Sequence, residues 1–220
     1  MRGRYDPTTR PGDLRRVAYP PGEHGACGDP AGEGGEGVST ISDAHTFAIQ
    51  AHAGQIDKGG QPYIRQLERV ANSTIVRAGH ARRVDRFDLD QIEVVQAAFL
   101  HDVLEDTATT STGLRPAGFS EWVVETVRIL TKPSEPTSYA TRIEALIKSG
   151  NVAAILIKLS DNEDNLRPAR TSPAGEALAA RYRASFDRLK EACRGRCKSR
   201  PINRPERAGL RRRFSAVGSA

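Results

Sequence analysis

Apolar residues recur at steps of three and four between residues 41 and 193, and strictly alternating runs are rare. This spacing places apolar side chains on one face of a helix, so it predicts amphipathic helices and little strand. We expect about seven helices, near residues 41–53, 65–79, 92–106, 121–130, 138–148, 152–166 and 173–193. The pattern therefore predicts an all-α helical bundle.

The two ends of the chain differ from this helical region. The first 37 residues hold nine Gly and five Pro, with almost no apolar periodicity. Such a segment buries too little apolar surface to offset the entropy lost on ordering. We expect a disordered tail at 1–38, one domain at 39–194 and a basic, Arg-rich tail at 195–220.

The formal net charge of +6 is concentrated in the last segment. From Arg194 onward the chain holds eight Arg, one Lys and one Glu, a charge of +8, so that residues 1–193 sum to −2. An excess of basic over acidic residues predicts a nucleic-acid partner only where the positive charge is concentrated on one surface. We therefore expect no nucleic-acid binding by the domain, and nucleic-acid contact by the tail stays an alternative.

The cysteines and the apolar runs indicate in which cellular compartment the protein resides. Cys27, Cys193 and Cys197 form no CxxC pair, so neither a disulfide framework nor a zinc cluster is indicated. The chain shows no signal-peptide pattern and no apolar run near the roughly 18 residues that a membrane span needs. We expect a cytoplasmic protein without membrane contact.

The segment AAFLHDVLEDT carries the first group of chemically active residues. His101 and Glu105 are four residues apart, as are Asp102 and Asp106, so a continuous helix would place each pair on one face. The apolar stripe of the preceding residues extends to both aspartates, which predicts their burial. Buried carboxylates are costly unless they are paired or bind a metal ion. The alternative is a solvated helix end.

A second group follows the strongly apolar helix near 152–166. Asp161 lies toward the end of this helix, where a buried acid needs a partner. Histidine and carboxylates together suit a divalent ion, which would lower the pKa of a bound water and favour attack on phosphorus. A salt bridge from Asp161 to Lys158 or Arg167 is the other interpretation.

Four segments in order, AHAGQIDKGGQPYI, HD, EDT and KLSDNEDNLR, resemble the hydrolase domain of RelA/SpoT proteins and the small alarmone hydrolases. The resemblance covers about Ile41 to Cys193. It implies an all-helical HD-type domain that binds Mn²⁺ or another divalent metal and removes the 3′-pyrophosphate of ppGpp or pppGpp. It also implies a small-molecule nucleotide as the partner.

The resemblance carries roles over to seven positions. By it, the metal ligands are His101, Asp102 and Asp161, the catalytic acids are Glu105 and Asp106, and the substrate-binding residues are Lys58 and Asn165. Lys58 has the alternative role of a solvent-exposed loop lysine. Asn165 has the alternative of bonding its own helix backbone.

The chain departs from the pattern at two positions. Gln66 stands where the family supplies the remaining ligand histidine, and Asp57 stands where the bifunctional enzymes carry an arginine associated with the guanine base. An amide oxygen is a poorer donor to manganese than imidazole, so we expect weaker metal binding. Two hypotheses follow: an active phosphohydrolase, or a nucleotide-binding pseudoenzyme that lost turnover through Gln66.

Overall fold

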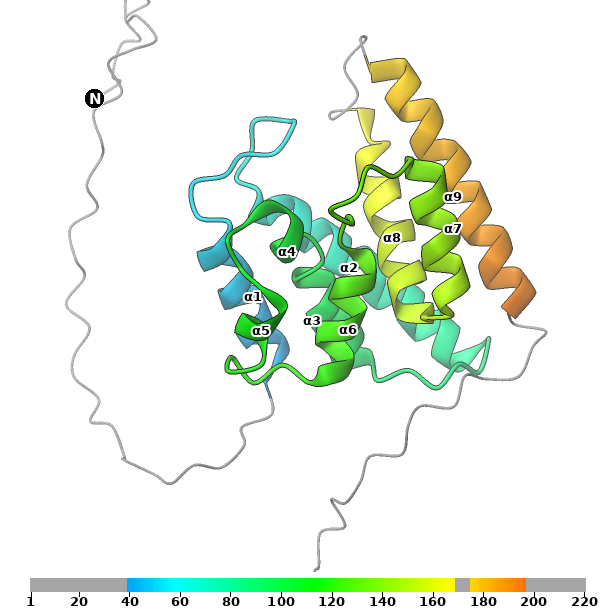
Figure 1. Cartoon of the computed structure of the whole chain (residues 1–220). Coiled ribbons are helices and arrows are strands. Elements are labelled where there is room, and N and C mark those ends of the chain that lie inside the picture. Colours follow the sequence, from blue (N-terminus) through cyan, green and yellow to red (C-terminus); the bar gives the residue numbers. More distant parts are fainter. Residues whose placement is uncertain (1–38, 169–174, 197–220) are drawn as a thin grey trace, which may run out of the picture. The chain divides into compact units, whose positions relative to one another are not determined.

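The structure, a computed structural model, describes residues 39–168 and 175–196 of the 220-residue chain (Figure 1). The expected tail at 1–38 lies outside these residues, and so does the expected basic tail at 195–220, with its alternative of nucleic-acid contact, except for residues 195 and 196. The described helices are α1 (Ile41–Ala51), α2 (Ile64–Arg83), α3 (Gln91–Phe99), α4 (Val103–Asp106), α5 (Ser111–Leu114), α6 (Glu121–Leu130), α7 (Tyr139–Ser149), α8 (Val152–Asn165) and α9 (Glu176–Arg196).

The all-α prediction is confirmed. Within the described ranges the chain forms helices joined by turns and loops, and extended pairing is limited to one isolated bridge between Ile56 and Pro62. All seven expected helices have counterparts. The structure adds the one-turn helices α4 and α5, which are too short to produce a hydrophobic period.

One prediction about these helices is wrong: the helix expected to run through residue 106 is interrupted. α3 ends at Phe99, and residues 100–102 form a turn before α4 begins. The His101 side chain provides a physical reason, because its Nδ1 donates to the Ala98 carbonyl oxygen at 2.8 Å. In a continuous helix that oxygen would accept the amide of residue 102.

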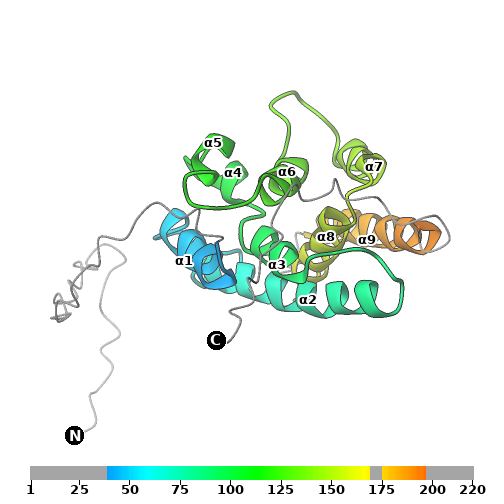
Figure 2. The same ribbon diagram turned by 90° about the horizontal axis from the view of Figure 1, so that it is seen from below.

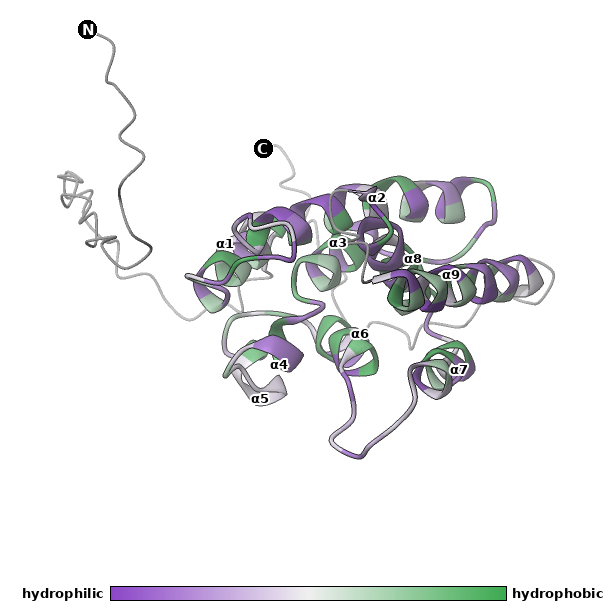
Figure 3. Ribbon diagram, turned by 90° about the horizontal axis from the view of Figure 1, so that it is seen from above, coloured by the Kyte–Doolittle hydropathy of each residue, from purple (hydrophilic) through white to green (hydrophobic). Residues whose placement is uncertain are grey.

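α8 packs against five of the described helices: α2, α3, α6, α7 and α9 (Figure 1). Figure 2 shows α2 running lengthwise beside α3 and α8, with α6 and α7 on their other side. Most of α8 is buried, including Ile155 and Ile157 at 0% exposure. α2 and α9 alternate between hydrophilic and hydrophobic colour (Figure 3), as helices with one solvent-facing side do. The buried stripes therefore fix how α2 and α8 meet.

No described helix is both long enough and apolar enough to cross a membrane.

The start of α8 is set by a tight connection from α7. Gly150 ends α7 at φ 77°, a left-handed conformation that glycine adopts without strain. Asn151 then caps α8, because its side chain accepts the Ala154 amide at 2.9 Å and donates to Thr126 Oγ1 at 3.0 Å. This one residue joins the start of α8 to α6.

We expect Asn151→Ala to lower the free energy of unfolding by about 1–2 kcal/mol, because the cap and the buried bond to Thr126 are lost together. Asn151→Asp keeps the capping oxygen and loses only the donor, so it should cost less. Urea unfolding of the three proteins measures both values. Equal stability of Asn151→Ala and the native chain would contradict the role of this cap.

Candidate functional site

His101 is fixed in the turn between α3 and α4, and it is 2% exposed. Its Nδ1 must carry a proton, because the carbonyl oxygen of Ala98 can only accept. Its Nε2 is buried, lacks a hydrogen bond of good geometry, and forms an ion pair with Asp102 Oδ2 at 3.1 Å, with Asp161 Oδ1 4.0 Å away. One imidazole nitrogen and two carboxylates thus meet inside the bundle.

Asp161 is 4% exposed and is surrounded by nitrogen donors. Lys158 Nζ donates to its Oδ2 at 2.7 Å, and Asn165 Nδ2 donates to its Oδ1 at 2.7 Å. Gln66 Nε2 approaches the same Oδ1 at 3.5 Å from α2. The salt bridge to Lys158 weighed from the sequence is therefore present, and Gln66 does stand beside the candidate ligands.

Tyr63 connects two of the acids. Its hydroxyl lies 2.7 Å from Asp102 Oδ2 and 3.0 Å from Asp106 Oδ2, and its single proton serves one of them at a time. The ring of His52 stacks on it, with centroids 4.7 Å apart and planes at 19°. Asp102 and Asp106 hence lie on one side of the turn, as expected, although the predicted burial is not found: Asp102 is half-buried and Asp106 is exposed.

Glu105 points away from this group, so the expected shared face with His101 is not formed. Its Oε2 accepts the Lys132 amide at 3.0 Å and Arg142 Nη2 at 3.2 Å. The carboxylate joins α4 to the loop after α6 and to α7. Of the two candidate acids, only Asp106 shares a hydrogen-bond partner with the candidate metal ligand Asp102.

Cations and tyrosines gather next to Lys158. A cavity of about 290 Å³ between the α6–α7 loop and α7 is lined in part by Tyr139, Arg142 and Lys158. The guanidinium of Arg181 lies 4.9 Å from the Tyr139 ring centre and 5.8 Å from that of Tyr182. We call the side chains of Lys58, Arg142, Lys158 and Arg181, with the rings of Tyr139 and Tyr182, the cationic region.

The two substrate-binding candidates lie in different surroundings. Lys58 is exposed, with its Nζ 3.5 Å from the Tyr182 hydroxyl, so it belongs to the cationic region. Asn165 is buried and bonds both the Asp161 side chain and, at 3.0 Å, the Asp161 carbonyl oxygen. The backbone bond weighed from the sequence is therefore present alongside the bond into the site.

The acids and bases of the site strongly shift one another's ionisation. Burial opposes a charge on His101, but the carboxylates of Asp102 and Asp161 outweigh it and raise the His101 pKa to about 9. Burial would likewise lower the pKa of Lys158, yet Asp161 and its other neighbours raise it. The pKa of Asp102 lies below its ordinary value, because the His101 charge outweighs burial. Burial, followed by Asp102 and Asp106, raises the pKa of Tyr63.

The donor types of this group fit a divalent cation. Donors that share an ion with bonds near 2.1 Å lie about 3 Å apart, which matches the contact between His101 and Asp102. In the described ranges, however, no group of three His, Cys, Asp or Glu side chains is arranged so that it could hold a metal ion as it stands. A metal ion between His101 and Asp161 would have to displace a proton from His101 and compete with Asn165 and Gln66 for Oδ1 of Asp161, the oxygen nearer the imidazole.

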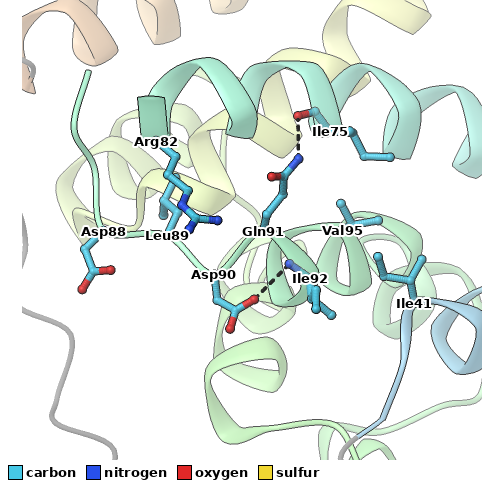
Figure 4. A pocket seen from close by; sticks show the side chains of 9 residues that line it. All are labelled: Ile41, Ile75, Arg82, Asp88, Leu89, Asp90, Gln91, Ile92 and Val95. Atoms are coloured by element: carbon cyan, nitrogen blue, oxygen red, sulfur yellow. Dashed lines mark hydrogen bonds between the residues drawn. The ribbon is translucent and has the colours of Figure 1, made fainter. Parts of the chain in front are cut away.

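Another hollow lies elsewhere on the domain. A cavity of about 530 Å³ beside the start of α3 is lined by residues that include Ile75, Arg82 and Gln91 (Figure 4). Gln91 donates to the Ile75 carbonyl oxygen, and Asp90 caps α3. None of the candidate site residues lines this cavity.

The sequence reasoning missed several residues that shape the site. Tyr63 was visible only as part of the PYI segment, and no pattern indicates that its hydroxyl reaches acids about forty positions away. Tyr139 and Arg142 appeared as part of an amphipathic helix. For Lys158 the sequence indicates only a salt bridge to Asp161, through its spacing of three residues.

Curated proteins that are similar to this chain are named as guanosine polyphosphate hydrolases. No protein-family model matches the chain. The guanosine-3′,5′-bis(diphosphate) 3′-pyrophosphohydrolase of Aquifex aeolicus is 34% identical over 133 residues, which are 58% of this chain and 17% of that protein. The protein of the same name from Haemophilus influenzae is 34% identical over 130 residues, 55% of this chain and 17% of that protein.

The bifunctional (p)ppGpp synthase/hydrolase SpoT of Escherichia coli is 29% identical over 140 residues, 59% of this chain and 18% of that protein. A solved structure described as a metazoan ortholog of SpoT that hydrolyzes ppGpp has a TM-score of 0.51 and 24% identity, covering 71% of this chain and 94% of that one. At that identity the match shows the fold alone. The chain thus resembles the RelA/SpoT-like HD hydrolase domain, and its match spans about a sixth of the Aquifex and Haemophilus relatives.

We expect Lys158→Met to lower the free energy of unfolding by about 3 kcal/mol, because it leaves the buried Asp161 carboxylate without its ammonium partner. Lys148→Met, at an exposed position of α7, is the control and should cost less than about 0.5 kcal/mol. Both are measured by denaturant unfolding in a chelating buffer. Similar losses in the two variants would show that the Lys158 ion pair contributes little.

Proposed function

We propose that the chain is a metal-dependent phosphohydrolase that removes the 3′-pyrophosphate of a guanosine polyphosphate such as ppGpp. The observation that carries this proposal is the meeting of His101, Asp102 and Asp161, with the buried Nε2 of His101 between two carboxylates. The names of the curated relatives support a ppGpp hydrolase function at the level of the domain.

The cationic region supports a phosphorylated nucleotide as the substrate. Lys58 and Arg181 are exposed near Tyr182, and no acidic partner is recorded for either within the described part of the chain. Guanidinium and ammonium groups bind phosphate oxygens, and a tyrosine ring offers a face on which a base stacks. The substrate would then lie with its phosphates between this region and Asp161.

The residues divide the chemistry among themselves. His101, Asp102 and Asp161 would hold the ion, with Gln66 at the remaining position. A bound divalent ion would polarise a phosphoryl oxygen and would lower the pKa of a water molecule, so that hydroxide is available as the nucleophile near neutral pH. Asp106, held by Tyr63, would orient the water and accept its proton, and Glu105 would keep Arg142 in place beside the phosphates.

The alternative is a nucleotide-binding pseudoenzyme, and one observation favours it. The Asp161 carboxylate is already satisfied by Lys158 and Asn165, with Gln66 close by. Each of these donors competes with a metal ion for the same oxygens. The two functions therefore differ in whether a divalent ion outcompetes the donors of the chain.

The purified chain should convert ppGpp with Mn²⁺ into GDP and pyrophosphate, and Asp102→Asn should abolish this turnover, because it removes a charged ligand without changing shape. Gln66→His should raise the affinity for Mn²⁺ by at least about 10-fold in calorimetry, since imidazole is the better donor. A native chain that is inactive until Gln66→His is introduced would establish the pseudoenzyme instead.

Substitution of the acids should separate their roles. Asp106→Asn should lower kcat by about 10²–10⁴-fold, because it removes the group assigned to the water. Glu105→Gln should act more weakly, through the position of Arg142, and mainly raise KM. Steady-state kinetics with ppGpp measures both variants. A larger loss of kcat in Glu105→Gln would reverse the assignment.

A further inference from the structure

Arg69 lies on α2 and holds two buried carboxylates at once. Its Nε and Nη2 donate to the two oxygens of Asp164 at 2.6 and 3.1 Å, and Nη2 also reaches Asp57 Oδ2 at 3.1 Å. The side chains of Asp57 and Asp164 are 2% and 3% exposed, whereas that of Arg69 is 26% exposed. A guanidinium that binds one carboxylate through two nitrogens is strongly oriented.

Asp57 connects Arg69 to the loop of residues 55–63, which lies beside the candidate site. Its Oδ1 accepts the amides of Gly59 at 2.8 Å and Gln61 at 3.0 Å, and its own amide donates to the Gln61 carbonyl at 2.7 Å. These bonds close a compact turn around residue 58. The carboxylate at position 57 thus shapes the turn with one oxygen and anchors it to Arg69 with the other.

The same loop is tied to the candidate site at both ends. Gln55 donates to the Asp106 carbonyl oxygen at 2.8 Å, and Tyr63 bonds the carboxylates of Asp102 and Asp106. Its middle, which carries Lys58, is fixed through Asp57. Asp164 belongs to the same end of α8 as Asp161, so Arg69 joins the loop to the helix end that bears a candidate ligand.

We propose that Arg69 is a positioning residue, which holds the 55–63 loop against the end of α8 and so presents Lys58 to the phosphates of the substrate. This role rests on the proposed function. Arg69 acts through Asp57 and Asp164 and does not itself touch the candidate metal ligands. Loss of Arg69 should therefore weaken substrate binding more than it changes the chemical step.

α2 offers a matched control in Arg77. Its side chain is 25% exposed and also crosses to α8, donating to Ser160 at 3.2 Å and to Glu163 at 2.8 Å. It makes no recorded contact with the 55–63 loop. Arg77→Gln thus removes a similar bridge between the same two helices and leaves the loop anchored.

The test compares Arg69→Gln, Arg69→Lys and Arg77→Gln in the full chain. Trypsin cleaves after Lys58 only when the loop opens, and mass spectrometry follows the fragment. Arg69→Gln should raise this cleavage rate by about 10-fold and raise KM for ppGpp by about 10-fold, with kcat within about 3-fold of the native value. Arg69→Lys, which keeps a charge, should lie between, and Arg77→Gln should change neither value.

Each outcome decides the proposal. Equal cleavage rates in Arg69→Gln and Arg77→Gln would show that Arg69 does not fix the 55–63 loop, whatever the hydrolytic activity of the variants. Faster cleavage with an unchanged KM would overturn the role of the loop in binding. If the native chain neither binds nor hydrolyses ppGpp, the proposed function and this role fail together, while the cleavage assay still reports on the loop. If Arg69→Gln does not fold, Arg69→Lys against Arg77→Gln makes the same comparison.

Discussion

The buried charge of Asp161 is the constraint on which the candidate site depends. A carboxylate at 4% exposure is stable only with donors around it, and each donor comes from a particular place in the bundle. Lys158 and Asn165 lie one turn before and after it on α8, and Gln66 reaches it from α2. The contact between α2 and α8 therefore forms part of the hydrophobic core and also places Gln66 beside Asp161.

A second constraint is the end of α3. The bond from His101 to the Ala98 carbonyl stops the helix and turns the imidazole toward Asp161. The residues after the break then follow a new axis, so that Asp106 meets Tyr63 while Glu105 meets Arg142. A continuous helix would have placed Glu105 with His101. The short interruption thus separates two neighbouring acids into different surroundings.

The sequence predicted the helical bundle and the group of His101, Asp102 and Asp161, because apolar periodicity and motif order report on them directly. It did not predict the break at residue 100, because a hydrogen bond from one side chain to one carbonyl oxygen does not change the spacing of apolar residues along the sequence. It also could not predict the contacts of Arg69 with Asp164, which are 95 positions apart. Asp57 was read as the loss of a cation, whereas in the structure its carboxylate shapes the loop and receives a cation from α2.

Gln66 connects the packing of α2 on α8 to the proposed chemistry of the site. A histidine at this position would present a lone pair, which leaves the centre of the site in need of a cation. The amide of Gln66 instead presents N–H toward Asp161, so the carboxylate is satisfied by the chain itself. Under the proposed function, Gln66 would therefore be both a weaker metal ligand and a donor to Asp161 when no ion is bound. Metal affinity would then equal the difference in free energy between a carboxylate bound by the ion and one bound by the donors of the chain.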